Sequence, residues 1–137
     1  DIVATRRRIP VRIVPELREI DMGAWENREQ AQIARCEAAA WTARGADLAG
    51  YRPPDGESFA DVAIRVAPVL SALMADPDLD TVAIAGHAGV DRVLLALALG
   101  LPLDRLFAFA LPYGALARLD FKGETASLAA LEVPGAA

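Results

Sequence analysis

The sequence is poor in the residues that build disulfides and metal clusters. It contains one cysteine, Cys36, and one histidine, His87, among 137 residues. A single cysteine excludes an internal disulfide, and it excludes a thiolate metal cluster built from one chain. A reducing cytoplasm is therefore the compartment that we expect.

The sequence also lacks an excess of positive charge. It has 14 lysines and arginines against 19 aspartates and glutamates, which gives a formal net charge of −5. Nucleic acids and anionic lipid surfaces require clustered positive charge, so neither is an expected partner. The basic run at residues 6–8 consists of three arginines, which we expect to be a solvated helix end.

Long apolar runs are missing as well. The longest such stretch, residues 93–103, is interrupted by Gly100 and Pro102 and is too short to cross a bilayer. The residues that follow Asp1 have neither the charged nor the apolar region of a secretory signal. We therefore expect no membrane association.

What is present suits one folded domain. Hydrophobic residues make up 54% of the chain and charged residues 24%, as in globular proteins with a substantial core. Nine prolines and ten glycines are spread along the chain, so no linker or internal boundary is visible. We predict a single domain over residues 1–137.

Hydrophobic periodicity and turn residues predict alternating helices and strands. The predicted helices are residues 1–8, as the end of a helix, and then 28–44, 58–74 and 90–99. The predicted strands are residues 11–14, 81–85, 106–111, 115–121 and 126–131. The strand at 81–85 is apolar after its first residue, which is typical of a central strand covered on both faces. This order predicts an α/β fold whose mostly parallel sheet is flanked by helices and ends in an antiparallel edge.

The passage from the predicted strand at 81–85 into the next helix is a candidate anion site. The free N–H groups of a first helical turn lie there, at the carboxyl end of a parallel strand. Gly86 and Gly89 permit close backbone approach, and His87 between them could hold a phosphoryl oxygen or assist its transfer. The alternative is that His87 caps the helix and forms only local hydrogen bonds.

The irregular acidic loop at residues 17–26 is a second candidate. Carboxylates alternate there with apolar anchors, and Glu19 is the acid best placed by spacing. An acid held among apolar anchors loses part of its water, which favours the protonated form that a general acid needs. The alternative is a solvated acidic loop in which Trp25 fills the core.

The turn before the predicted helix at 58–74 is a third candidate. Glu57 could serve the active site or the helix terminus, where Asp55 or Ser58 is a candidate cap. Three aromatic residues could line a pocket for an organic group or could simply pack: Trp41, Tyr51 and Tyr113.

Together these segments resemble the histidine phosphatase superfamily, in the branch related to phosphoglycerate mutase and α-ribazole phosphatase. Residues 17–27 resemble the family's glutamate-bearing loop, and residues 53–59 resemble its turn before a long helix. Residues 83–92 resemble the strand and turn that carry its second active-site histidine. The three segments follow one another in the family's order and cover nearly the whole chain.

The resemblance implies roles for individual residues. Glu19 corresponds to the proton donor, and His87 corresponds to the second active-site histidine. The backbone amide of Ala88 would face the phosphate. Arg65 corresponds to the arginine usual in the long helix, and it would support the site together with Glu57.

The chain also departs from the family. Members begin with a strand that ends in an Arg-His-Gly motif, whose histidine becomes phosphorylated, and a second arginine follows on a later helix. Neither segment occurs in the 137 residues, and His87 cannot supply both histidines. Residues 1–8 correspond to the end of the helix before the glutamate loop. We expect that the N-terminal portion was omitted or cleaved off, rather than lost from the gene.

For the complete protein, the resemblance implies a phosphomonoester hydrolase or mutase that works through a phosphohistidine, without metal or other cofactor. The expected partner is then a small phosphorylated substrate, and the sequence leaves it undecided whether the protein forms a homodimer. The rival hypothesis is a non-catalytic phosphate-binding or interaction module of the same fold. The hypothesis of a nucleotide-binding domain has less support, because residues 86–89 lack both the glycine spacing of a dinucleotide-binding motif and the lysine of a P-loop.

Overall fold

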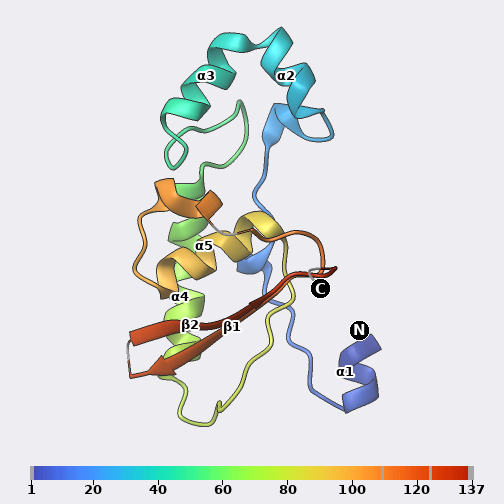
Figure 1. Cartoon of the computed structure of the whole chain (residues 1–137), viewed down its shortest axis with the longest axis vertical. Coiled ribbons are helices and arrows are strands. Elements are labelled where there is room, and N and C mark those ends of the chain that lie inside the picture. The colour runs from blue at the N-terminus through green and yellow to red at the C-terminus, as the bar shows by residue number, and fades with distance from the viewer. Residues whose placement is uncertain (1, 109, 124, 136–137) are drawn as a thin grey trace.

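Helices make up most of the regular structure in the computed structural model, which describes residues 2–108, 110–123 and 125–135 (Figure 1). The α-helices are α1 (Ile2–Arg7), α2 (Gln30–Cys36), α3 (Ala38–Ala46), α4 (Phe59–Ala75) and α5 (Ala88–Ala98). The 3₁₀ helices are η1 (Pro15–Leu17), η2 (Gly23–Trp25) and η3 (Leu103–Ala108), and the strands are β1 (Leu116–Lys122) and β2 (Thr125–Glu132).

The main core lies between α4 and α5. Apolar residues at helical spacing on both helices meet there, and η3 adds one more side chain. The buried members are Phe59, Val62, Val66, Val90, Val93, Leu94, Ala96 and Leu106. Burial of such side chains contributes roughly 1.5–3 kcal/mol each, so this contact fixes how α5 is presented to the rest of the chain.

The predicted helix at 58–74 is confirmed as α4, and its first residues explain where it begins. The Ser58 hydroxyl accepts a hydrogen bond from the Asp61 amide at 3.2 Å, and the Asp61 carboxylate accepts one from the Ser58 amide at 2.8 Å. These reciprocal bonds satisfy amides that a helix start leaves free. Hydrogen bonds from Ser58, and then from Arg52, lower the pKa of Asp61 to about 2. Ser58 is therefore the cap, and Asp55 is not.

The predicted helix at 28–44 is wrong as one element, because α2 and α3 are separated at Glu37. The Glu37 backbone leaves the helical region, with φ −131° and ψ 48°. Its carboxylate accepts a hydrogen bond from Trp25 Nε1 at 2.8 Å and pairs with Arg28. The bond from Trp25, followed by the bond from Arg28, lowers the pKa of Glu37. These contacts account for a break that periodicity alone does not reveal.

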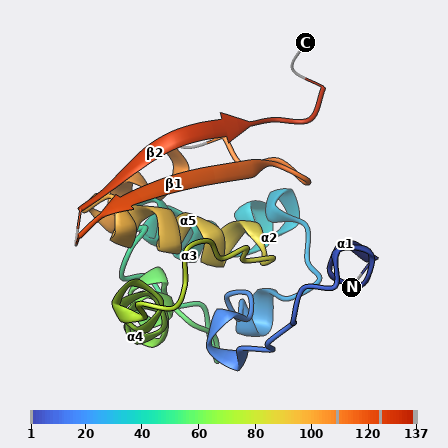
Figure 2. The same cartoon turned by 90° about the horizontal axis from the view of Figure 1, so that it is seen from below.

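The two predicted C-terminal strands are confirmed as an antiparallel pair. β1 and β2 pair from Leu116 with Glu132 to Lys122 with Thr125, with an irregularity between Arg118 and Leu119. Figure 2 shows that α5 lies between this hairpin and α4. The hairpin and α4 therefore cover two sides of α5.

Three other predicted strands do not form among the described residues. Residues 81–85 and 11–14 belong to no strand, and residues 106–108 belong to η3, whereas Phe109 lies outside the described residues. A strand needs a hydrogen-bonded neighbour, and the described part of the chain offers none to residues 81–85. Val82 and Ile84 are consequently 44% and 40% exposed instead of covered on both faces. The parallel sheet expected from the sequence is not seen among the described residues.

Candidate functional site

The Glu19 carboxylate binds the N-terminus of α5. Its Oε2 accepts a hydrogen bond from the Gly89 amide at 3.0 Å, and its Oε1 accepts one from the Val90 amide at 3.0 Å. Oε1 also accepts a bond from the neighbouring Ile20 amide at 2.8 Å. The first turn of a helix has N–H groups without partners inside the helix, and Glu19 supplies acceptors to two of them. The amides of Gly89 and Val90 at this helix start are thus bound by the chain's own Glu19 side chain.

Gly89 makes this approach possible. A Cβ atom added at Gly89 would overlap Oε1 of Glu19 and would lie 3.0 Å from Cγ2 of Ile20. The requirement here is space for the carboxylate and not an unusual backbone angle. Gly89 is therefore the position at which the helix and the Glu19 loop depend on each other most directly.

His87 precedes this turn as the N-cap residue of α5. Its backbone is extended, with φ −122° and ψ 156°, and its carbonyl accepts a hydrogen bond from the Asp91 amide at 2.8 Å. The His87 side chain is exposed and makes no capping hydrogen bond. Glu19 caps the helix instead, so the alternative in which the His87 side chain acts as the cap is wrong. The Ala88 amide donates no hydrogen bond to any described residue.

Asp91 is an acidic residue of this site that the sequence reasoning missed. Burial, followed by the nearby charge of Glu19, raises the pKa of Asp91, whereas His87 and Arg92 oppose the shift. Its carboxylate also lies against Gly86, where an added Cβ would overlap Oδ1. The available signal was its position four residues after His87, which places both on the first turn of one helix.

Glu57, in the turn before α4, forms a partly buried ion pair with Arg65 on α4. Nε of Arg65 donates to one Glu57 oxygen at 2.9 Å and Nη2 donates to the other at 3.0 Å. Glu57 also accepts bonds from Arg18 at 2.8 Å and from the Asp21 amide at 3.1 Å. The Arg65 bonds are the main reason that the pKa of Glu57 is lowered. Glu57 therefore binds Arg65 and the acidic loop, and it does not cap α4.

Arg65 also binds the backbone that leads to Glu19. Its Nη1 donates to the carbonyls of Glu16 and Arg18, the latter at 2.9 Å, and its Nη2 donates to the Glu19 carbonyl at 3.2 Å. A planar guanidinium suits this role because its five N–H donors have a fixed geometry. The ion pair of Arg65 and Glu57 thus connects α4 to the loop that carries Glu19.

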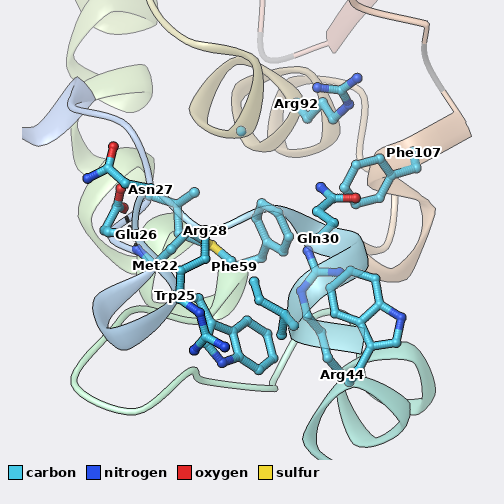
Figure 3. Close-up of a pocket in the computed structure, with 14 residues that line it drawn as sticks. Met22, Trp25, Glu26, Asn27, Arg28, Gln30, Arg44, Phe59, Arg92 and Phe107 are labelled. Carbon is cyan, nitrogen blue, oxygen red and sulfur yellow. Dashed lines mark hydrogen bonds between the residues drawn. The ribbon is translucent and has the colours of Figure 1, made fainter. Parts of the chain in front are cut away.

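A cavity of about 290 Å³ adjoins this arrangement (Figure 3). Gly89 and Ile20 line it on the side of α5, and Trp41 and Arg44 line it on the side of α3. Of the three aromatic residues considered above, Trp41 lines the cavity. Tyr51 stacks on Trp25 with ring centroids 5.5 Å apart, and Tyr113 is fully exposed. Arg44 and Arg92 were missed as lining residues: Arg44 lies in no recognisable motif, and Arg92 ends the segment 83–92, in which only His87 and Ala88 were singled out as site residues.

Residues 2–108, 110–123 and 125–135 contain neither a membrane-spanning helix nor a candidate metal-binding cluster. None of their helices is long and apolar enough to cross a membrane. Their histidine, cysteine and acidic side chains form no group of three that could hold a metal ion.

Comparisons with known proteins agree on one family. Residues 1–134 match the histidine phosphatase superfamily (branch 1). The adenosylcobalamin/α-ribazole phosphatase of Escherichia coli K12 is 28% identical over 130 residues, which are 95% of this chain and 64% of that protein. The chain thus spans about two thirds of the length of this relative.

Solved structures of the same family have the same fold. A putative α-ribazole-5′-phosphate phosphatase from Escherichia coli K-12 matches with a TM-score of 0.84 at 27% identity, over 96% of this chain and 65% of that one. A mycobacterial glucosyl-3-phosphoglycerate phosphatase in complex with inorganic phosphate matches with a TM-score of 0.79 at 28% identity, over 93% and 67%. The α/β fold is therefore that of phosphoglycerate mutase-like proteins, and the chain belongs to the histidine phosphatase superfamily.

Proposed function

We propose that these 137 residues are part of a longer protein that hydrolyses phosphomonoesters through a phosphohistidine. The observation that carries the proposal is the Glu19 carboxylate bound beside His87 at the N-terminus of α5. The similar proteins named above, which are phosphatases by name, support it. The proposed substrate is a small phosphorylated molecule.

The proposed mechanism combines groups at this helix end with a nucleophile from outside the 137 residues. A histidine outside the 137 residues attacks phosphorus in line, since His87 is the single histidine within them. The His87 side chain and the Ala88 amide stabilise the charge that develops on the equatorial oxygens. Glu19 protonates the leaving oxygen, and water then cleaves the phosphohistidine. We propose that none of these steps needs a metal ion.

Glu57 and Arg65 have a positioning role in this proposal. They do not touch the reacting phosphoryl group, and the bonds of Arg65 to the Glu16, Arg18 and Glu19 carbonyls hold the proton donor in place. A small displacement of the proton donor greatly lowers the rate of hydrolysis, because reacting groups must be held in a narrow range of geometry. This pair is thus proposed to act through Glu19.

We also propose that residues 81–85 pair as a strand of a parallel sheet in the longer protein, which makes residues 1–137 one incomplete domain. Val82 and Ile84 are 44% and 40% exposed, and the alignment with the Escherichia coli phosphatase covers 64% of that protein, which leaves about a third of its length outside the match. An extended segment with free N–H and C=O groups is a site for pairing with another strand. Covering its apolar side chains contributes about 25 cal/mol per Å² of apolar surface.

A second candidate function is a phosphate-binding module without catalysis. The Glu19 carboxylate already binds the amides of Gly89 and Val90, so a phosphate here would bind to the Ala88 amide and the His87 side chain, and such binding does not require turnover. In that case the longer protein would bind phosphate and would form no phosphohistidine.

Hydrolysis of p-nitrophenyl phosphate in the presence of a chelator tests the proposal. We expect the longer protein to turn over this substrate. His87→Ala should lower kcat about 100-fold or more. Arg35→Gln, at an exposed position on α2, should leave kcat unchanged. The 137-residue chain alone should show no turnover. Equal turnover by His87→Ala, or robust turnover by the 137 residues, would contradict the mechanism. Phosphate binding without turnover in the longer protein would favour the second candidate.

A further inference from the structure

The cavity beside Gly89 has an unusual charge for this chain. Arg28, Arg44 and Arg92 all line it, and Glu26 is the one carboxylate among its lining side chains. The chain as a whole carries a formal charge of −5, so this is a local reversal of sign. A cavity lined in this way attracts anions, because low-dielectric walls strengthen the field of the charges around it.

Among the described residues, two of the three guanidinium groups form no salt bridge. Arg28 pairs with Glu37, whereas no salt bridge joins Arg44 or Arg92 to an acid of the described residues. Burial lowers the pKa of Arg44, which indicates that this charge is partly removed from water. Charges that lose water without gaining a partner are costly, and a bound anion would offset that cost.

Arg92 contains an unsatisfied donor. Its Nη1 donates to the Ala88 carbonyl at 2.9 Å, but its buried Nε has no hydrogen-bond partner. Its guanidinium lies 5.1 Å from the centre of the Phe107 ring. Buried donors without a partner are rare in folded proteins, and an acceptor such as a bound anion would satisfy this one.

Aromatic faces accompany these cations. The guanidinium of Arg44 lies 5.5 Å from the centre of the Trp41 ring, and the Trp25 ring is 6.1 Å from that of Trp41. In Figure 3, Arg92 and Phe107 lie on the side of α5, and Arg44 lies on the side of α3. Rings and guanidinium planes together favour a flat organic group, which stacks on them, with an anionic substituent.

The cavity adjoins the proposed phosphoryl site. Gly89, whose amide binds Glu19, also lines the cavity, as does Ile20, the residue after Glu19. A group attached to the leaving oxygen beside Glu19 would therefore extend into it. We infer that the cavity holds the leaving group of the substrate, and that this leaving group is a flat, unsaturated ring system with a second anionic group. The inference rests on the proposed function for its link to the reaction.

A phosphate-free probe tests the cavity independently of turnover. 2-Naphthoate should bind the longer protein about tenfold more tightly than neutral 2-naphthalenemethanol does. Tryptophan fluorescence and calorimetry measure the two affinities. Arg44→Gln and Arg92→Gln should each weaken naphthoate binding about fivefold or more, and Arg35→Gln should not. Arg44→Glu should shift the preference toward 2-naphthylmethylammonium, a gain that misfolding cannot produce. Equal affinities for the anionic and neutral probes, or unchanged binding in both glutamine variants, would overturn the inference.

The link to the reaction has its own measurement. The longer protein should hydrolyse 6-carboxy-2-naphthyl phosphate with a kcat/KM about tenfold higher than that of 2-naphthyl phosphate, and Arg44→Gln should remove this preference. Naphthoate binding without any phosphatase activity would refute the proposed function and the leaving-group role, and would leave an anion-binding cavity. Turnover of both esters at equal rates would refute the leaving-group role alone.

Discussion

Oε2 of Glu19 accepts a hydrogen bond from the backbone N–H of Gly89 at 3.0 Å, although 70 positions separate the two residues in the sequence. This contact joins the acidic loop to the first turn of α5. It also places the proposed proton donor beside His87, the N-cap of that helix.

Gly89→Ala should reduce turnover of the longer protein more than it reduces stability. The added Cβ overlaps the end of the Glu19 side chain, which can move, and alanine is the better helix former by about 1 kcal/mol. We expect the free energy of unfolding to change by less than about 1 kcal/mol and kcat to fall about 10- to 100-fold. Gly45→Ala is the matched control, because a Cβ there meets nothing within 4 Å. Equal kcat values for the two variants would contradict the proposed role of Glu19.

Arg65→Lys should lower kcat while KM stays nearly constant. Lysine keeps the charge but cannot bind both Glu57 oxygens and the loop carbonyls at once, so the Glu19 loop loses its fixed position. We expect kcat to fall about tenfold. The measurement is kcat and KM of both proteins as a function of pH, including the acidic range. A higher KM at unchanged kcat would instead place Arg65 in substrate binding.

Glu57→Gln should destabilise the protein at neutral pH and not in acid. The folded-state pKa of Glu57 lies below its ordinary value of 4.5, so its charge stabilises the fold above that pH. The contribution is lost as the pH falls below 4.5 and through the lowered pKa. We expect a loss of about 1–2 kcal/mol at pH 7, measured by urea unfolding, and a smaller difference between the two proteins below pH 4. A difference that did not depend on pH would contradict this account.

Asp91→Asn should have the opposite pH dependence. The folded-state pKa of Asp91 lies above its ordinary value of 3.8, because burial and Glu19 disfavour its charge. The fold therefore loses stability as the pH rises from 3.8 through the raised pKa, and it keeps this deficit at neutral pH. We expect the asparagine variant to gain stability relative to the wild type between acid and neutral pH, measured by thermal unfolding. A relative loss over that range would show that Asp91 is favoured in its charged form.

Local signals made part of the fold predictable. The spacing of apolar residues and the Ser58 cap predicted α4, and turn residues on both sides of residues 115–121 predicted the hairpin. Both depend on nearby residues, as helix caps and tight turns do. Residues 81–85 were predicted as a strand from a pattern that reflects burial, but pairing depends on a neighbour that the described residues lack. The break at Glu37 likewise depends on Trp25, a contact that periodicity does not record.

The candidate site was predictable as a set of residues and not as a geometry. Glu19, His87 and the amides after His87 were chosen from separate segments, and the structure brings Glu19 to this helix end. The bonds of Glu57 and Arg65 to residues 16–21 join positions that lie 36 to 49 residues apart in the sequence, so no local pattern encodes them. The unpaired arginines of the cavity were not predicted, because a guanidinium without a partner differs from a solvated one only in three dimensions.

Binding of vanadate to the longer protein tests the central claim most directly, since vanadate takes the place of the transferring phosphoryl group. Calorimetry of the wild type, His87→Ala and Arg35→Gln separates the proposed site from a general surface effect. If His87 and the Ala88 amide bind the phosphoryl group, His87→Ala should raise the Kd about tenfold or more, and Arg35→Gln should leave it unchanged. Equal affinities of the wild type and His87→Ala would contradict the assignment of the site to the N-terminus of α5.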